Sequence, residues 1–190
     1  MTPKIVAFAG SLRKESYNRK ALATAVQGAR DAGADVTVAD LRDYPMPIYD
    51  ADWHAEHGVP SQMLALRKLM MSSHGLLIAS PEYNTSITPL LKNTIDWLSQ
   101  EVNGESGSAP FAGRICGLMG ASNGGFGTIR ALPHVSYILS NLGVLVLPVV
   151  AIPKVGSVLG PDGSIQDKRI HEMVHGLGTR VTETIIKLKT

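Results

Sequence analysis

A hydroxyl-rich segment that carries one arginine follows the first apolar run of the chain, Lys4 to Ala9. It reads GSLRKESYN over residues 10–18 and ends where a helical pattern begins. A helix N-terminus offers unpaired backbone N–H groups and a partial positive charge, and serine hydroxyls and Arg13 add further donors. The pattern predicts a phosphate-binding loop, although a capped surface turn with incidental serines would have the same composition.

Two common nucleotide-binding motifs are absent from the sequence. No G-x-x-x-x-G-K-[ST] segment is present, which argues against a P-loop nucleotide hydrolase. No G-x-G-x-x-G segment follows the first apolar run, so the loop lacks the glycines that let a backbone wrap a pyrophosphate. A single terminal phosphate therefore suits this segment better than a dinucleotide.

Two more polar loops follow later apolar runs. Residues 80–87 read SPEYNTSI, and an aromatic ring with several backbone amides could lie there beside a flat heteroaromatic ring. Residues 120–127 read GASNGGFG, and glycines allow close backbone approach and positive φ. Each loop alone could be an ordinary connection or a tight turn. Three such loops, each after a strand of one sheet, predict a binding site more strongly than any one of them.

Short apolar runs alternate with longer helical patterns, which predicts an α/β fold with a parallel sheet covered by helices on both faces. Ligands bind such sheets beyond the carboxyl ends of the strands, where the three loops stand. No internal repeat or linker divides the chain, so we expect a single domain over residues 1–190. The expected strands are 4–9, 35–39, 75–80, 115–120 and 144–150, and the expected helices are 19–32, 61–72, 88–100, 128–141 and 166–187, with a long connection over 41–60. Pro133 predicts a kink or a late start in the fourth helix.

Composition narrows the class of protein. The chain has 190 residues, 44% of them hydrophobic and 18% charged, with a net charge of +2, which is typical of an ordered globular domain. Lysine and arginine are scattered rather than clustered, so nucleic-acid binding is not expected. The apolar stretch at the N-terminus is too short for a signal peptide, and no window approaches the roughly 18 apolar residues of a membrane span. We therefore expect a cytoplasmic protein that does not insert into membranes.

The cysteine and histidine content gives little support for a redox thiol or a metal. Cys116 is the only cysteine and lies in an apolar run, so a buried strand residue is favoured over a nucleophile. His54 and His57 are three residues apart, and His171 and His175 are four apart, which are spacings that could ligate zinc. No third ligand accompanies either pair, and no metal site is predicted.

The three loops together resemble the NADPH-dependent FMN reductase family, the flavodoxin-like group that includes quinone, azo and chromate reductases. The segments that carry the resemblance are GSLR (10–13) with Ser16 and Asn18, PEYN (81–84), LKNTIDW (91–97) and GGFG (124–127). Two positions depart from the family pattern. Thr88-Pro89-Leu90 stands where Pro-Gly is frequent, and Asn123 stands where proline is frequent, and both changes affect loop shape near the expected flavin.

The resemblance implies a five-stranded parallel sheet of order 2-1-3-4-5 and a bound FMN. By position, Ser11, Arg13, Ser16 and Asn18 would hold the FMN phosphate, with Tyr17 nearby. The isoalloxazine ring would be lined by Pro81, Glu82, Tyr83 and Asn84, and its other edge would be approached by Ser122, Gly124 and Gly125.

The implied activity is hydride transfer from NADPH or NADH through FMN to a small-molecule acceptor such as a quinone, a flavin, an azo compound or a metal oxyanion. The flavin carries the chemistry, so no catalytic acid or base is expected, and Tyr83 is the candidate for shaping the acceptor face. Family members commonly form dimers or tetramers, so a homodimer or homotetramer is expected. The role of the 41–60 loop stays open: its Trp53 either covers a flavin or is an ordinary half-exposed side chain.

Two other classes of function remain as alternatives. A flavodoxin-type electron carrier would bind FMN without oxidising NAD(P)H itself, but such carriers tend to be strongly acidic and this chain is not. A hydrolase or transferase on the same sheet would use Ser11 or Glu82 as nucleophile, and the sequence shows no histidine or aspartate partner for either.

Overall fold

The computed structural model describes residues 1–189 of the chain. Its centre is a parallel sheet in which the strands lie in the order β2-β1-β3-β4-β5, and a short strand β6 also pairs with β4. This is the flavodoxin-like order that was expected. The strands are β1 (Lys4–Ala9), β2 (Asp35–Val38), β3 (Gly75–Ala79), β4 (Ile115–Ala121), β5 (Leu145–Val146) and β6 (Val150–Ile152).

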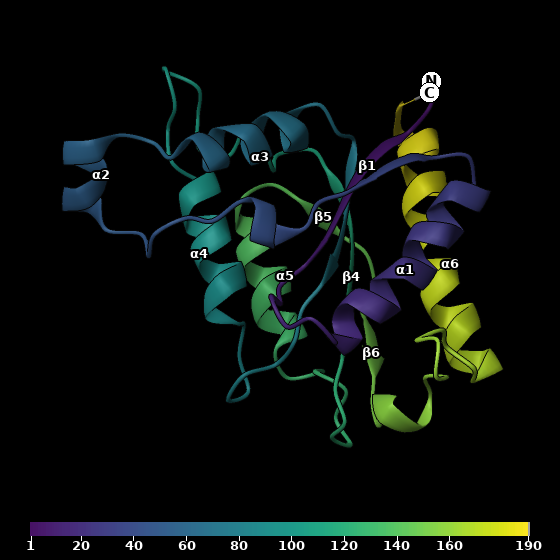
Figure 1. Cartoon of the computed structure of the whole chain (residues 1–190). Helices are drawn as coiled ribbons and strands as arrows, with labels where there is room; N and C mark the ends of the chain where they lie inside the picture. Colours follow the sequence, from purple (N-terminus) through teal and green to yellow (C-terminus); the bar gives the residue numbers. More distant parts are fainter. Residues whose placement is uncertain (190) are drawn as a thin grey trace.

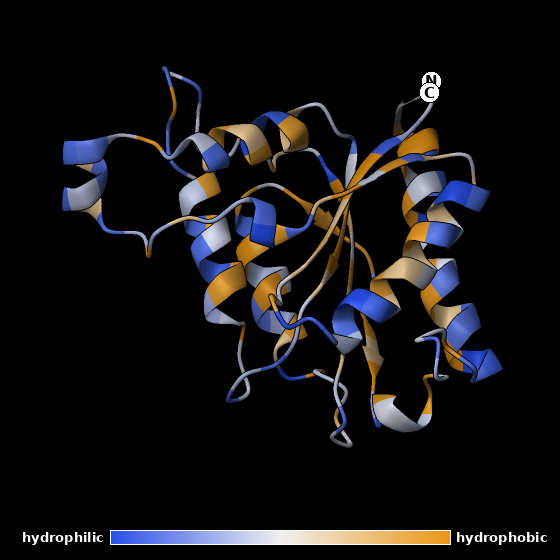
Figure 2. Cartoon of the chain, in the orientation of Figure 1, coloured by the Kyte–Doolittle hydropathy of each residue, from blue (hydrophilic) through white to orange (hydrophobic). Residues whose placement is uncertain are grey.

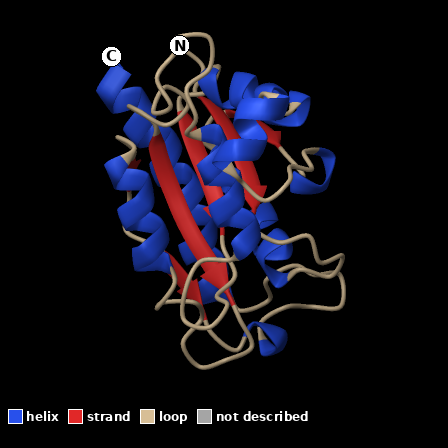
Figure 3. Cartoon of the chain, turned by 90° about the vertical axis from the view of Figure 1, so that its left-hand side faces the viewer, coloured by secondary structure: helices blue, strands red, loops and turns tan. Residues whose placement is uncertain are grey.

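Helices cover both faces of this sheet, as Figures 1 and 3 show. On one face lie α1 (Tyr17–Asp31) and α6 (Lys168–Lys189), and on the other α3 (Ser61–Met71), α4 (Pro89–Leu98) and α5 (Leu132–Asn141). Two hydrophobic clusters fill the spaces between the sheet and these layers. Strands β3 and β4 are buried along their whole length, which explains why they appear in the sequence as continuous apolar runs.

The close approach of α1 and α6 depends on two glycines that face each other across the helix pair. A Cβ atom on Gly28 would lie 2.0 Å from the carbonyl oxygen of His175, and one on Gly178 would lie 1.9 Å from that of Ala25. Glycine inside a helix normally costs about 1 kcal/mol relative to alanine. The helix forms despite its glycines because packing against α1 requires the missing side chain.

Some element boundaries differ from the expected ones. The strand expected over 144–150 is divided into β5 and β6, and Pro148, which lacks an N–H for the ladder, lies between them. Helix α1 begins two residues earlier than expected, because Ser16 caps it. Helix α5 starts at Leu132, so Pro133 marks a late start rather than a kink.

The 41–60 connection contains a helix that sequence patterns missed. Asp50 caps α2 (Ala51–His57), which projects from the body of the protein beyond α3 and α4 (Figure 1). Figure 2 shows the strands as mainly hydrophobic and α2 as mainly hydrophilic. Helix α2 buries no residue, so no apolar stripe marks it in the sequence.

The register of the sheet brings the loops of interest together. Ala9 pairs with Ala79, and Ala79 pairs with Met119, so β1, β3 and β4 end at the same edge. The loops that follow these strands gather at the bottom of Figures 1 and 3. Among the described helices, none combines the length and the hydropathy that a membrane crossing requires.

Candidate functional site

A cavity of about 190 Å³ opens at this edge of the sheet, between the loops that follow β1, β3 and β4. Nine of the residues selected from the sequence line it, and Ala121 joins them as the last residue of β4. Sequence reasoning placed Ala121 in the 120–127 loop but did not select it as a site residue. Asn84, Gly124 and Gly125 were also selected but are outside the lining. The lining residues are Ser11, Arg13, Ser16, Tyr17, Asn18, Pro81, Glu82, Tyr83, Ala121 and Ser122.

The β1 loop presents two buried serines at the start of α1. The Ser16 side chain caps the helix by accepting a hydrogen bond from the backbone N–H of Arg19 at 3.4 Å. The Ser11 side chain accepts from the backbone N–H of Arg13 at 3.3 Å. Both hydroxyl groups act as acceptors here, so each keeps its own hydrogen for donation. The first N–H groups of α1 also have no partner within the helix.

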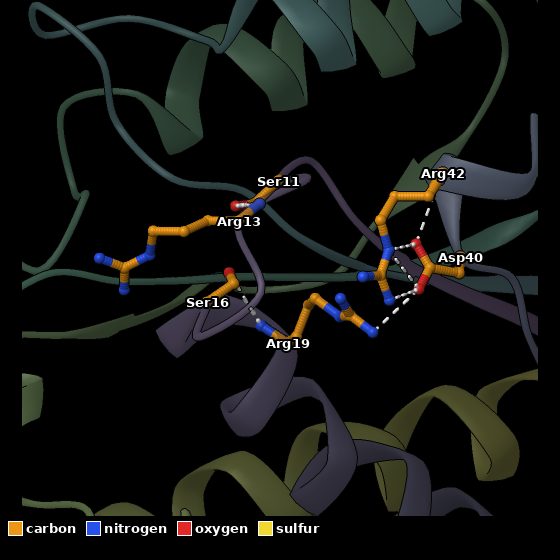
Figure 4. Close-up of polar contacts among 6 residues, drawn as sticks. All are labelled: Ser11, Arg13, Ser16, Arg19, Asp40 and Arg42. Carbon is orange, nitrogen blue, oxygen red and sulfur yellow. Dashed lines mark hydrogen bonds and ion pairs between the residues drawn. The ribbon is translucent and has the colours of Figure 1, made fainter. Parts of the chain in front are cut away.

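Arg13 has no carboxylate partner in the part of the chain that the structure describes, and Figure 4 shows its side chain extending away from Arg19 and Arg42. Its guanidinium group donates to the backbone carbonyl of Glu15 at 2.6 Å and lies 4.9 Å from the centre of the Tyr17 ring. Within the described residues, no carboxylate is within ion-pair distance of Arg13, so its positive charge is available to an anion.

Arg19 and Arg42, in contrast, turn toward the carboxylate of Asp40 (Figure 4). Arg19 lies 2.9 Å from it and Arg42 2.5 Å. The hydrogen bonds from Arg42, together with the charge of Arg19, lower the pKa of Asp40 to about 2. Asp40 is therefore the shared ion-pair partner of both arginines, whereas Arg13, which has no carboxylate partner among residues 1–189, can face a ligand.

Asn18 is oriented by the sheet rather than by the cavity. Its side-chain amide donates to the carbonyl oxygen of Ala121 and accepts from the N–H of the same residue, both at 2.9 Å. The residue is 4% exposed. Asn18 thus extends the hydrogen bonding of β4 and fixes the start of α1 against the end of that strand.

The β3 loop is a tight turn that presents Tyr83. Tyr83 and Ser86 exchange two backbone hydrogen bonds, and Asn84 and Thr85 between them have φ values of 49° and 66°. Two left-handed residues at the tip of a two-residue turn are typical of a type I′ geometry. The Ser86 hydroxyl also lies 2.9 Å from Nδ1 of His134 on α5. The turn is therefore held on both sides, and Tyr83 remains about half exposed.

Glu82 bridges the β3 loop and the start of α5. Its carboxylate forms an ion pair with the Arg130 guanidinium group and accepts hydrogen bonds from the backbone N–H groups of Arg130 and Ala131, both at 3.2 Å. A carboxylate held in this way has little remaining capacity for other partners. Glu82 lines the cavity, but its carboxylate is used to hold the two loops together.

The β4 loop closes the opposite side of the site. Asn123 donates to the Tyr17 hydroxyl at 3.3 Å and accepts from the N–H of Gly156 at 3.0 Å. The carbonyl oxygen of Gly124 accepts from the N–H of Lys154 at 3.1 Å. A Cβ atom on Gly125 would have no heavy atom within 4 Å, so this backbone is open to close approach from outside.

The other candidate groups lie away from this site. Cys116 is fully buried in β4, and burial raises the pKa of its thiol, as the buried-strand interpretation requires. No group of three or more histidine, cysteine, aspartate or glutamate side chains in the described part of the chain could hold a metal ion. Trp53 stacks on His57 and meets the edge of the Trp97 ring at 5.8 Å, so it packs on α4 rather than over the cavity.

Comparison with known proteins identifies the family of this chain. The model of the NADPH-dependent FMN reductase family matches residues 3–156. The chain belongs to this family. It is similar to an NAD(P)H-dependent FMN reductase of Pseudomonas aeruginosa, with 35% identity over 173 residues, covering 90% of this chain and 89% of that protein. It is also similar to a quinone reductase of Escherichia coli, with 33% identity over 147 residues, covering 76% of this chain and 73% of that protein.

Solved structures show the same fold. A flavoenzyme NAD(P)H:acceptor oxidoreductase from Paracoccus denitrificans superimposes with a TM-score of 0.82 at 24% identity, covering 98% of both chains. An archaeal flavodoxin superimposes with a TM-score of 0.62 at 12% identity, covering 96% of this chain and 99% of that one. At these identities the superpositions support the flavodoxin-like fold and no finer statement.

Proposed function

We propose that this member of the FMN reductase family holds FMN in the cavity between the β1, β3 and β4 loops and passes reducing equivalents from NAD(P)H to a small acceptor such as a quinone or a flavin. The observation that carries the proposal is the group of phosphate donors at the start of α1. Ser11, Ser16 and the guanidinium group of Arg13, which has no carboxylate partner among the described residues, lie together beside free helix N–H groups.

The cavity fits FMN in chemistry and can enclose part of it. Its phosphate end offers hydroxyl, backbone and guanidinium donors. Of the residues that line it in the described chain, only Glu82 carries a carboxylate, and Arg130 neutralises that group. A volume of about 190 Å³ is below the roughly 300 Å³ at which pockets begin to enclose a small molecule. Part of FMN would be enclosed, and one face of the ring would remain open to NAD(P)H and acceptor.

The residues around the cavity bind and orient rather than transfer protons. Bound FMN supplies the hydride chemistry through its ring. Asn18 fixes α1 against β4, the Tyr83–Ser86 turn provides a rigid wall, and the open backbone at Gly125 allows close contact with a ring edge. Holding two reactants in register accounts for much of the rate in such a reaction, so no acid or base is assigned.

The alternatives fit the residues less well. Neither serine nor glutamate has the environment of a nucleophile: Ser11 accepts from a backbone N–H, and Glu82 is paired with Arg130. An electron carrier would share the cavity, but the net charge of +2 is unlike that of strongly acidic carriers, and the similar proteins of known name are reductases.

The proposal also covers the domain organisation, oligomeric state, location and partners of the protein. We infer one domain, which is supported by the single sheet to which all described strands belong. We also propose a homodimer or homotetramer that works in the cytoplasm and binds neither nucleic acid nor membranes. The scattered charge and the net charge of +2 support the absence of a nucleic-acid partner.

The test is a spectrum of the purified protein with added FMN, followed by NADPH or NADH under anaerobic conditions. We expect FMN to bind and its visible absorbance to bleach, and a quinone to restore it. Bound FMN that neither donor bleaches would instead support the electron carrier. Protein that binds no FMN would refute the assignment of the cavity.

A further inference from the structure

Phe126 is an exposed aromatic side chain in the β4 loop. It stands between Gly125 and Gly127, and it is 63% exposed. Exposed single apolar side chains are common on proteins, so exposure alone assigns no role. What distinguishes Phe126 is that its position is fixed from three directions.

The loop is fastened on both sides of Phe126. Before it, the carbonyl oxygen of Gly124 accepts a hydrogen bond from the N–H of Lys154 at 3.1 Å. After it, Gly127 has a φ of 55° and packs so closely that a Cβ atom there would lie 2.4 Å from the backbone nitrogen of Pro153. Both contacts involve the segment that follows β6, so the backbone that carries Phe126 has little freedom.

The third constraint comes from Arg130, whose guanidinium group lies 4.7 Å from the centre of the Phe126 ring. This distance is within the range of a cation–π contact. Arg130 is in turn oriented by Glu82, to which its Nε donates at 2.8 Å. The Glu82 side chain is only 8% exposed and lines the cavity, so this chain of contacts connects the Phe126 ring to a wall of the cavity.

We propose that Phe126 is a wall of the acceptor subsite and stacks on planar aromatic acceptors, with Arg130 and Glu82 as positioning residues. Arg130 covers one face of the ring, so the rest of the exposed ring is available to a flat partner. Offset or edge-to-face contact with such a partner is favourable, and the fixed ring loses little freedom when the partner binds. The inference rests on the proposed function, because it names the class of acceptor for the same site.

The first experiment compares two acceptors in the holoenzyme, a flat naphthoquinone and the octahedral ferricyanide ion. We expect Phe126→Leu to raise the KM for the naphthoquinone by roughly 3- to 10-fold, because the free energy of one aromatic contact is lost. The KM for NAD(P)H and the rate with ferricyanide should stay unchanged. Tyr137→Leu is the matched control, since Tyr137 is a 71% exposed aromatic on α5 outside the cavity lining. This variant should change neither the KM for the naphthoquinone nor the rate with ferricyanide.

The second experiment tests the positioning residues through Phe126. Arg130→Met should raise the KM for the naphthoquinone, Arg130→Lys should restore part of the loss, and Phe126→Leu with Arg130→Met should be no worse than Phe126→Leu alone. Additive effects of the two substitutions would overturn the positioning role.

The outcomes separate this inference from the proposed function. An active enzyme in which Phe126→Leu affects both acceptors equally, or neither, would refute the inference alone. A protein that reduces neither acceptor would refute the proposed function and the inference with it.

Discussion

Replacing Asn18 by alanine is expected to destabilise the protein before any ligand is added. The side chain forms two hydrogen bonds of 2.9 Å with the backbone of Ala121, and the residue is 4% exposed. Alanine removes both partners and leaves an N–H and a carbonyl group of β4 without them. If Asn18 served only to hold a phosphate, the same substitution would weaken ligand binding and leave the apoprotein intact.

The expected loss follows from the two backbone groups. A buried polar group left without a partner costs about 1–3 kcal/mol. Two such groups, partly relieved by entry of water, give a loss of about 2–4 kcal/mol in the free energy of unfolding. For a chain of this size, 1 kcal/mol corresponds to roughly 2–4 °C in Tm, so the midpoint should fall by about 4–16 °C. Asn18→Asp should be at least as damaging, since it replaces the donor with a charge that faces the carbonyl oxygen.

The assay is urea and thermal unfolding of the apoprotein, followed by circular dichroism. Asn141→Ala is the control, because this asparagine is exposed at the end of α5 and should change stability by less than about 0.5 kcal/mol. Equal unfolding midpoints for the Asn18→Ala and control variants would refute the structural role of Asn18.

Three other perturbations have definite expected results. Arg13→Met should lower FMN affinity by roughly 10- to 100-fold, the value of a charge-assisted hydrogen bond, and leave riboflavin affinity unchanged, as fluorescence titration of both ligands can show. Gly178→Ala should cost at least about 2 kcal/mol in urea unfolding, because its Cβ would lie 1.9 Å from the carbonyl oxygen of Ala25, whereas Gly176→Ala meets only a flexible side chain and should cost nothing. The pKa of Asp40 lies at about 2, below its ordinary value near 3.9, so its ion pairs stabilise the protein above pH 4 and lose that effect as the pH falls toward 2. Between pH 4 and pH 2 the free energy of unfolding of the wild type should fall by about 1 kcal/mol more than that of Asp40→Asn. Equal losses would contradict the role of the ion pairs with Arg19 and Arg42.

The sequence was sufficient to predict the parallel sheet, its order through the family resemblance, and the three loops of the site. Buried strands give continuous apolar runs, and the polar residues that follow them must lie at the carboxyl edge of the sheet. It could not predict helix α2, which buries no residue, or the break between β5 and β6 around Pro148. The segment that precedes α2 is placed by tertiary contacts, because the carbonyl oxygen of Pro47 accepts hydrogen bonds from Asn93 and Trp97 on α4.

Individual roles within the loops were harder to predict than the loops themselves. Ser11, Ser16, Arg13 and Asn18 looked alike as phosphate donors, because all four are polar and stand near a helix start. The structure separates them by what each side chain already contacts. Arg13 has no carboxylate partner, whereas both polar atoms of Asn18 bind the backbone of Ala121. Such a difference depends on a contact 103 residues away in the chain, and no local pattern carries it.

The rigid walls of the site have the same origin. The edge of a parallel sheet exposes backbone groups that need partners, and ligand loops at that edge must be held without help from the sheet. Asn18 pairs with the backbone N–H and carbonyl groups of Ala121 at the end of β4, and Glu82 joins the β3 loop to the start of α5. These are the side chains best suited to hydrogen bonding with a substrate, and the fold uses them to hold its loops. A site of this kind is suited to a cofactor that carries its own chemistry, because what remains for the protein is to hold that cofactor still and leave one face open.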